Sequence, residues 1–311
     1  MPAPGLRWLV LASPRAVTEE RAFWNALREL VSERAFQDLS ARNGFDLRQS
    51  ASALVAGFDF GTLYLVSADG HDARITEHFQ SRLLQGAKVA RPHPRLTRIT
   101  GVAGTTPEAL LRAEQQLVAV AVDDPSLVRL VEGYLLGRFR KTPTALRGAA
   151  LAELAEFARD APVRAFFPGP FDEHHVPGPL RGALLASATA VACAVSIRDR
   201  DATGAPDDSL TFHVRLALAG DWSRDETASS RLHAAWQALS VTSPGRWFGL
   251  DRPVSPATVR ASASLLELEL DLDGRRLLEA TRDAAHTELT ELFGESTDAS
   301  HMKREGHTLD Q

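Results

Sequence analysis

The segment from residue 264 to 274, SLLELELDLDG, alternates apolar and acidic residues at every second position. Four leucines between Leu266 and Leu272 share one side of an extended chain, whereas Glu267, Glu269 and Asp271 share the other, because successive side chains of a strand point to opposite sides. This period of two predicts a strand in a sheet with one buried face and one solvated face. Sheets of that kind are typically antiparallel or mixed, which restricts the fold class at once.

Strand and helix patterns follow one another along the rest of the chain. Residues 188–198 and 209–220 are predicted to form a hairpin in which Phe212 faces the core while His213 and Arg215 face solvent. Amphipathic helices are predicted between strands, because apolar residues recur there at helical spacing. The other strand patterns lie at residues 6–12, 61–68, 96–104, 118–123 and 163–169. This order favours an α+β fold with antiparallel or mixed sheets and helices packed mainly on one face.

Capping residues predict where three helices begin. Thr106 is expected to cap a helix with Pro107 in its first turn, where the missing N–H of proline costs nothing. Ser223 and Glu226 match a capping box, in which each side chain bonds the backbone N–H of the other residue. Asp124 is expected to cap a helix directly after the strand that ends at residue 123.

The length of the chain predicts more than one structural unit. A single core stops growing near about 250 to 300 residues, and this chain has 311. A boundary near residue 150 gives an N-terminal α/β-patterned half (1–150), a C-terminal α+β half (151–293) and a polar tail (294–311) that is expected to be mobile. In both halves a strand leads through an aspartate into an amphipathic helix, so two similar halves and an internal duplication are a further hypothesis.

Charge and composition argue against several classes of function. A net charge of −5 does not provide the basic surface that a nucleic-acid-binding protein needs, so no nucleic-acid partner is expected. No stretch of about 18 consecutive apolar residues occurs, so no transmembrane segment is expected. Only three of the 35 basic residues are lysines, which indicates a high-GC bacterial genome. The compartment stays open: cytoplasmic for the sequence as given, periplasmic or lipid-anchored if a leader was removed.

The segment FDEHHVPGP, residues 171–179, places potential metal ligands side by side. In an extended chain Asp172 and His174 lie on the same side and could share a metal ion, whereas His175 points away. A catalytic zinc site needs about three protein ligands, and no HExxH spacing supplies the third. We interpret the segment as a polar connector and keep a metal-dependent hydrolase, with a site near Asp172 and His174, as an alternative.

Two other segments share part of the pattern of a ligand-binding loop. In DRDATGAPDDSL, residues 199–210, acidic residues occupy the first and third positions of a calcium loop, but Leu210 stands where a bidentate glutamate is needed. In GVAGTTPEAL, residues 101–110, a glycine-bearing turn precedes the helix predicted at Thr106, but the lysine of a phosphate-binding loop is missing. We interpret both as ordinary connections.

Aromatic residues between glycines mark two further segments, AGFDFG at 56–61 and GRWFGL at 245–250. We expect them to close the ends of a core, with a small-ligand pocket near Trp247 and Phe248 as the alternative. The chain has neither a GxSxG elbow nor a CxxC pair. We therefore predict a non-enzymatic protein that binds another protein or serves in structure or assembly, with no cofactor and no catalytic or metal-binding residue. The alternatives are the hydrolase and a small-ligand carrier, and the oligomeric state is left open.

Overall fold

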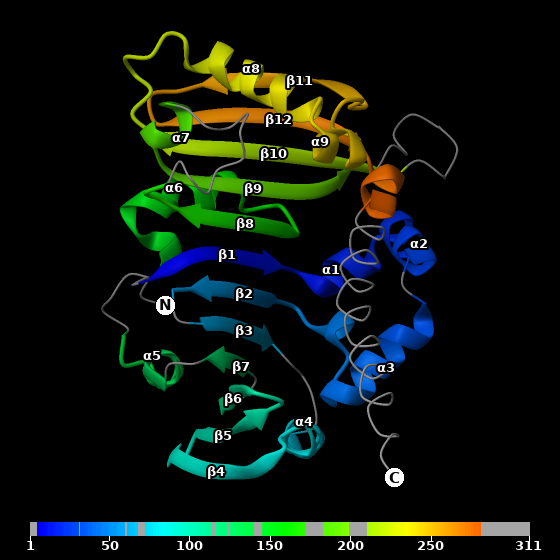
Figure 1. Ribbon diagram of the computed structural model, residues 1–311, viewed down its shortest axis with the longest axis vertical. Helices are drawn as coiled ribbons and strands as arrows, with labels where there is room; N and C mark the ends of the chain where they lie inside the picture. Colours follow the sequence, from blue (N-terminus) through cyan, green and yellow to red (C-terminus); the bar gives the residue numbers. More distant parts are fainter. Residues whose placement is uncertain are drawn as a thin grey trace, which may run out of the picture.

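The computed structural model describes residues 5–30, 32–59, 61–67, 72–113, 116–122, 125–139, 145–171, 183–198 and 210–280. The strands among them form one twelve-stranded sheet (Figure 1). In chain order they are β1 (Leu6–Ala12), β2 (Ala53–Phe58), β3 (Gly61–Ser67), β4 (Gln85–His93), β5 (Leu96–Ala103), β6 (Thr106–Ala113), β7 (Gln116–Val122), β8 (Val163–Pro168), β9 (Ala188–Arg198), β10 (Thr211–Gly220), β11 (Ser255–Ala261) and β12 (Leu265–Asp273). Their order across the sheet is β11-β12-β10-β9-β8-β1-β2-β3-β7-β6-β5-β4.

Each neighbouring pair in this sheet is antiparallel. The predicted α+β class with an antiparallel sheet is thereby confirmed. The N-terminal strands β1 to β7 meet the C-terminal strands β8 to β12 where β1 pairs with β8. In both groups three consecutive strands lie side by side, and the last strand returns next to the third, β7 beside β3 and β12 beside β10. The internal duplication itself stays a prediction.

The helices occur between these strands along the sequence. They are α1 (Pro14–Glu19), α2 (Arg21–Leu30), α3 (Glu33–Asn43), α4 (Asp72–Ser81), α5 (Pro125–Leu135), α6 (Ala149–Phe157), α7 (Ala183–Ser187), α8 (Ala228–Ser240) and α9 (Ser243–Trp247), with two short 3-10 helices, η1 (Leu47–Gln49) and η2 (Ala145–Arg147). A further helical stretch, residues 274–280, follows β12.

One face of the sheet, called the α6 face below, holds the largest buried cluster. Cross-strand register places Leu9 of β1, Phe166 of β8 and Ala192 of β9 side by side on it, and α5 and α6 pack over it. Ala190, Ala192 and Ala194 of β9 are fully buried there. Because these side chains are small, α6 can approach the strand closely.

The opposite face, called the α8 face below, carries three smaller clusters among the described residues, and in one of them Phe212 of β10 packs against Phe23 of α2 and Leu277. At the top of Figure 1, α8 packs on β11 and β12, over the leucines that the period of two assigned to one side of β12. Near the other end of the sheet, Ile75 and Phe79 of α4 pack on Ile99 of β5 and Leu110 of β6. The buried face predicted for the segment 264–274 is thereby confirmed.

The helix predicted to begin at Thr106 is wrong, because residues 106–113 form strand β6. β5 and β6 make a hairpin in which Ala103 lies opposite Thr106, and Gly104 in the turn has φ 61°, a conformation that glycine adopts without steric cost. Leu110 faces α4, whereas Leu111 faces the core of the α6 face. A run of apolar residues buried on both sides lacks the alternation by which a strand is recognised.

The helix predicted at Ser223 begins later, with Thr227 as the N-cap of α8. Asp225 accepts hydrogen bonds from the backbone N–H and the hydroxyl of Thr227, and from Arg231. These bonds hold residues 225–227 in a turn ahead of the helix, so the predicted pairing of Ser223 with Glu226 does not set its start.

Next to the pairing of β1 with β8, we predict that substitutions of two adjacent phenylalanines lower the free energy of unfolding by unequal amounts. Phe166 is 1% exposed and lies opposite Leu9, whereas Phe167 points to the other face and is 38% exposed. We expect Phe166→Ala to lower the free energy of unfolding by about 3 to 5 kcal/mol through the cavity it leaves. Phe167→Ala should cost about 1 kcal/mol or less. Urea denaturation measures both, and equal losses would contradict a core that spans this joint.

Candidate functional site

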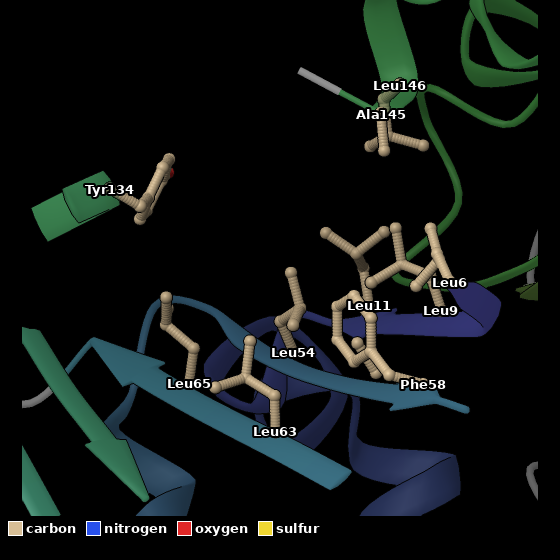
Figure 2. A pocket seen from close by; sticks show the side chains of 11 residues that line it. Leu6, Leu9, Leu11, Leu54, Phe58, Leu63, Leu65, Tyr134, Ala145 and Leu146 are labelled. Carbon is tan, nitrogen blue, oxygen red and sulfur yellow. The ribbon is translucent and has the colours of Figure 1, made fainter. Parts of the chain in front are cut away.

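A cavity of about 240 Å³ lies between strands β1 to β3 and the segment that holds α5 and η2 (Figure 2). Leu11, Leu54 and Leu65 point into it from the sheet, and Leu146 and Tyr134 border it on the opposite side. Eleven of the described residues line the cavity, and all of these except Tyr134 are leucine, alanine or phenylalanine. The lining therefore offers water almost no hydrogen-bond partner.

Strand register explains why these side chains meet. Leu11 lies opposite Leu54, and Leu54 lies opposite Leu65, so one row of leucines crosses three strands. In the next row the middle residue is Ala56, between Leu9 and Leu63. The small side chain of Ala56, which is 1% exposed, leaves room in the centre of the sheet floor.

The volume sets the size of what the cavity could hold. At roughly 30 Å³ per water molecule, it corresponds to about eight waters. It is larger than an engineered apolar cavity of roughly 150 Å³ that stays dry and binds benzene, and smaller than the pockets of roughly 300 to 1,000 Å³ that hold drug-sized ligands. It therefore suits a single ring, a short alkyl chain, or the apolar end of a longer molecule.

A polar cluster lies on the α6 face in the C-terminal strands. Asp271 of β12 is only 6% exposed. Its Oδ1 is 2.9 Å from Nδ1 of His213 on β10, so the imidazole carries a proton at Nδ1 in this contact. Its Oδ2 accepts hydrogen bonds from Nη1 of Arg198 and from the hydroxyl of Ser255, each at 2.9 Å. Four adjacent strands thus supply the carboxylate and its three partners.

The solvated face predicted from the acidic side of β12 is therefore wrong at Asp271. His213 and Arg215 were also expected to face water. The His213 side chain is 16% exposed, and the guanidinium of Arg215 lies 4.8 Å from the ring centre of Phe157 at the end of α6. Helix α6 packs over this face of the sheet and excludes water from it. The alternation of apolar and polar residues had predicted a solvated face.

Two opposing effects act on the pKa of Asp271. Burial raises the pKa, because it removes water from the charged carboxylate. Hydrogen bonds from His213 and Ser255, together with the positive charge of Arg198, outweigh burial and hold the pKa below the ordinary aspartate value. The carboxylate is therefore charged at neutral pH and stabilises the arrangement of the four strands.

The pairing of Asp271 with His213 resembles the part of a catalytic triad that orients the base. Ser196 lies directly opposite His213 on β9 and on the same face. No hydrogen bond joins the side chains of these two described residues, and Arg198 and Ser255 occupy the second carboxylate oxygen. This arrangement satisfies a buried carboxylate and does not present an activated nucleophile.

The structure describes some of the site residues suggested by the sequence and leaves others outside the described ranges. Asp172 and His174 lie outside the described residues, as do residues 199–209 of the calcium-like segment. Within the described ranges, no group of three or more His, Cys, Asp or Glu side chains could hold a metal ion. The glycine-bearing turn at 101–110, interpreted as an ordinary connection ahead of a helix, is the turn of a β-hairpin, so no helix begins there.

The two aromatic segments have different surroundings. Trp247, at the end of α9, is 45% exposed and its ring centre lies 5.5 Å from that of Phe248, but the cavity described above lies elsewhere. From the segment 56–61, Ala56 and Phe58 line that cavity. The glycine-flanked aromatic pattern thus marked one segment of the site, whereas the leucines on β1 and β3 gave only a strand signal.

Three comparisons with known proteins found no match to the chain: no protein-family model, no curated protein and no solved structure. Among the helices that the structure describes, none is both long enough and apolar enough to cross a membrane.

The buried cluster predicts a clear cost for neutralising its carboxylate. We expect Asp271→Asn to lower the free energy of unfolding at pH 7 by about 2 to 4 kcal/mol, because His213, Arg198 and Ser255 lose a charged acceptor. Glu267→Gln on the same strand and face is the matched control, since Glu267 is only partly buried. It should change the free energy by less than about 0.5 kcal/mol. Equal losses in the two variants would contradict the role given to Asp271.

The same carboxylate predicts a pH dependence of defined sign. A group whose folded pKa is depressed stabilises the protein above its unfolded pKa, about 3.9 for aspartate, and loses that contribution as the pH falls through the folded value. The difference between wild type and Asp271→Asn should therefore shrink as the pH falls from about 5 to below about 3.5. Chemical denaturation at several pH values measures it, and a constant difference would show that the charge of Asp271 contributes nothing.

Proposed function

We propose that this protein is a non-enzymatic binding protein, and that the cavity between β1 to β3 and α5 takes a small apolar ligand or the apolar end of a larger one. The observation that supports the proposal is the near-complete apolar lining, among the described residues, of a partly open cavity of about 240 Å³. Of the sequence alternatives, this favours the small-ligand carrier, with its pocket at the leucines of the sheet and away from Trp247 and Phe248.

The energetic cost of an empty space supports a ligand. Cavity-creating substitutions lose about 24 cal/mol for each Å³ of cavity left behind. On that scale a fully enclosed, unfilled cavity of this size would cost on the order of 6 kcal/mol, and because this one is partly open to solvent its cost is smaller. A ligand that fills the space recovers much of this free energy through contacts that the lining otherwise lacks.

The position of the polar groups argues for binding over catalysis. Among the described lining residues, Tyr134 alone carries a side-chain hydroxyl, and none of the charged residues described above borders the cavity. A single hydroxyl in an otherwise apolar described lining can orient a ligand, but no second acid, base or nucleophile stands beside it among the described lining residues. The absence of a nucleic-acid partner, the bacterial origin and the internal duplication stay predictions beside this proposal.

Ligand-dependent stabilisation tests the proposal. Benzene and n-hexanol serve as probes, and we expect either to raise Tm, because a ligand at about 100 times its Kd adds roughly 2.7 kcal/mol to the free energy of unfolding. Leu54→Trp should abolish the shift by placing an indole in the cavity. Val55→Trp is the control, since neighbouring strand residues point to opposite faces, and it should keep the shift.

A second cavity-filling variant keeps the test valid if Leu54→Trp does not fold. Ala56→Leu adds volume to the floor of the same cavity, and near-UV circular dichroism reports whether each variant keeps its tertiary packing. No Tm shift in the wild type with either probe would refute the proposal. An undiminished shift in a folded Leu54→Trp or Ala56→Leu variant would place the bound probe elsewhere.

A further inference from the structure

We propose that the outer edge of β4 binds an extended, acidic segment of a partner protein by strand addition. β4 is the last strand of the described sheet and pairs with β5 on one side only. The N–H and C=O groups on the outer side of an edge strand are a template for another strand. At the other end of the sheet, the edge strand β11 packs against α8.

Exposed apolar side chains accompany this edge. Val89 of β4 is 54% exposed and lies opposite Ile99 of β5, which is 1% exposed beneath α4. Leu84, just before β4, is 74% exposed although its backbone N–H bonds the carbonyl of Val102 at 2.9 Å. A strand added beside β4 would cover Val89 and extend the small core that α4 closes.

The charge of this region differs from that of the whole chain. Between residues 82 and 107 no acidic residue occurs, whereas five cations do, in a chain whose net charge is −5. Of these five, Arg98 pairs with Glu132 of α5 at 2.8 Å, while Lys88 and Arg91 are exposed on β4 itself. An approaching acidic segment is attracted by such a cluster, which raises its rate of association.

The same charges select against a second copy of this chain. Antiparallel pairing of two β4 edges would bring cations into opposition across the new interface, and like charges directly opposite each other are destabilising. Lysine on an edge strand is a common protection against self-association. A partner strand that alternates glutamate with valine would instead place its carboxylates on the face of Lys88 and its apolar groups on the opposite face, beside Val89.

The backbone limits the length of the contact. The pairing of β4 with β5 shifts register between Gln85 and Lys88 and again between Ala90 and His93, and Pro92 has no N–H to donate. The uninterrupted register with β5 therefore covers residues 88–90, within a segment of five residues, 87–91, that the two shifts and Pro92 enclose. A short partner segment, about five residues within a longer acidic stretch, matches this length.

A defined peptide tests the proposal on the full chain. The probe is a fluorescein-labelled peptide of sequence EVEVEVE, and fluorescence anisotropy measures its Kd. We expect saturable binding that weakens at high salt and that weakens at least tenfold in the double variant Lys88→Glu/Arg91→Glu. The control, Arg224→Glu/Arg246→Glu, makes the same charge change at exposed positions on the C-terminal half and should leave the Kd within about twofold, because screening limits long-range effects.

Strand addition is separated from simple charge attraction by a backbone probe. The same peptide N-methylated at alternate residues keeps its charges but cannot donate hydrogen bonds along one edge, and it should lose binding. Hydrogen exchange should show added protection of amides within residues 87–91 when the unmodified peptide is bound. Equal binding of the methylated peptide, unchanged exchange at β4, equal weakening in the control variant, or preferred binding of double-stranded DNA would each overturn the proposal.

Discussion

The pairing of β1 with β8 is the interaction on which the rest of the structure depends. It joins seven strands on one side to five on the other, and it places Leu9 beside Phe166 in a core that continues across the joint. Each strand would otherwise present an unpaired backbone edge, which is costly to bury and prone to wrong pairing. The same pairing aligns the α6 face across both groups of strands, so α5 and α6 can contribute to one core.

The two interior features of the sheet show opposite uses of burial. Around Asp271, four strands enclose a charged group and satisfy both of its oxygens, as a buried charge requires. Beneath α5, three strands present leucines to a space that the protein's own atoms leave unfilled. The Asp271 cluster stabilises the C-terminal strands of the sheet. In the cavity, contacts between a proposed apolar ligand and the leucines would lower the free energy of the complex. Their separation is consistent with a division between structural and binding roles.

Much of the fold could be predicted from the sequence. Particular residues show where the prediction failed. The alternation in β12 and the helical spacing in α5 are local patterns, and the structure has a strand and a helix where they predict them. β6 was missed because Leu110 and Leu111 are buried on opposite faces, which makes the run indistinguishable from a helix signal. The cavity was missed because Tyr134 and Leu54 are distant in sequence and only the sheet floor has a local pattern.

By itself the sequence determined which side chains share a face of β12, an α+β class with antiparallel or mixed sheets, and the absence of a complete local catalytic motif, because each depends on neighbours within a few residues. Only the tertiary structure decided which face loses its water, since that depends on where α6, α5 and α4 dock. For this reason Asp271, acidic and exposed by pattern, lies in a buried network, whereas Lys88 and Arg91 are exposed on β4, the end strand of the described sheet. Burial is a property of the assembled layers, and alternation reports only that the two faces differ.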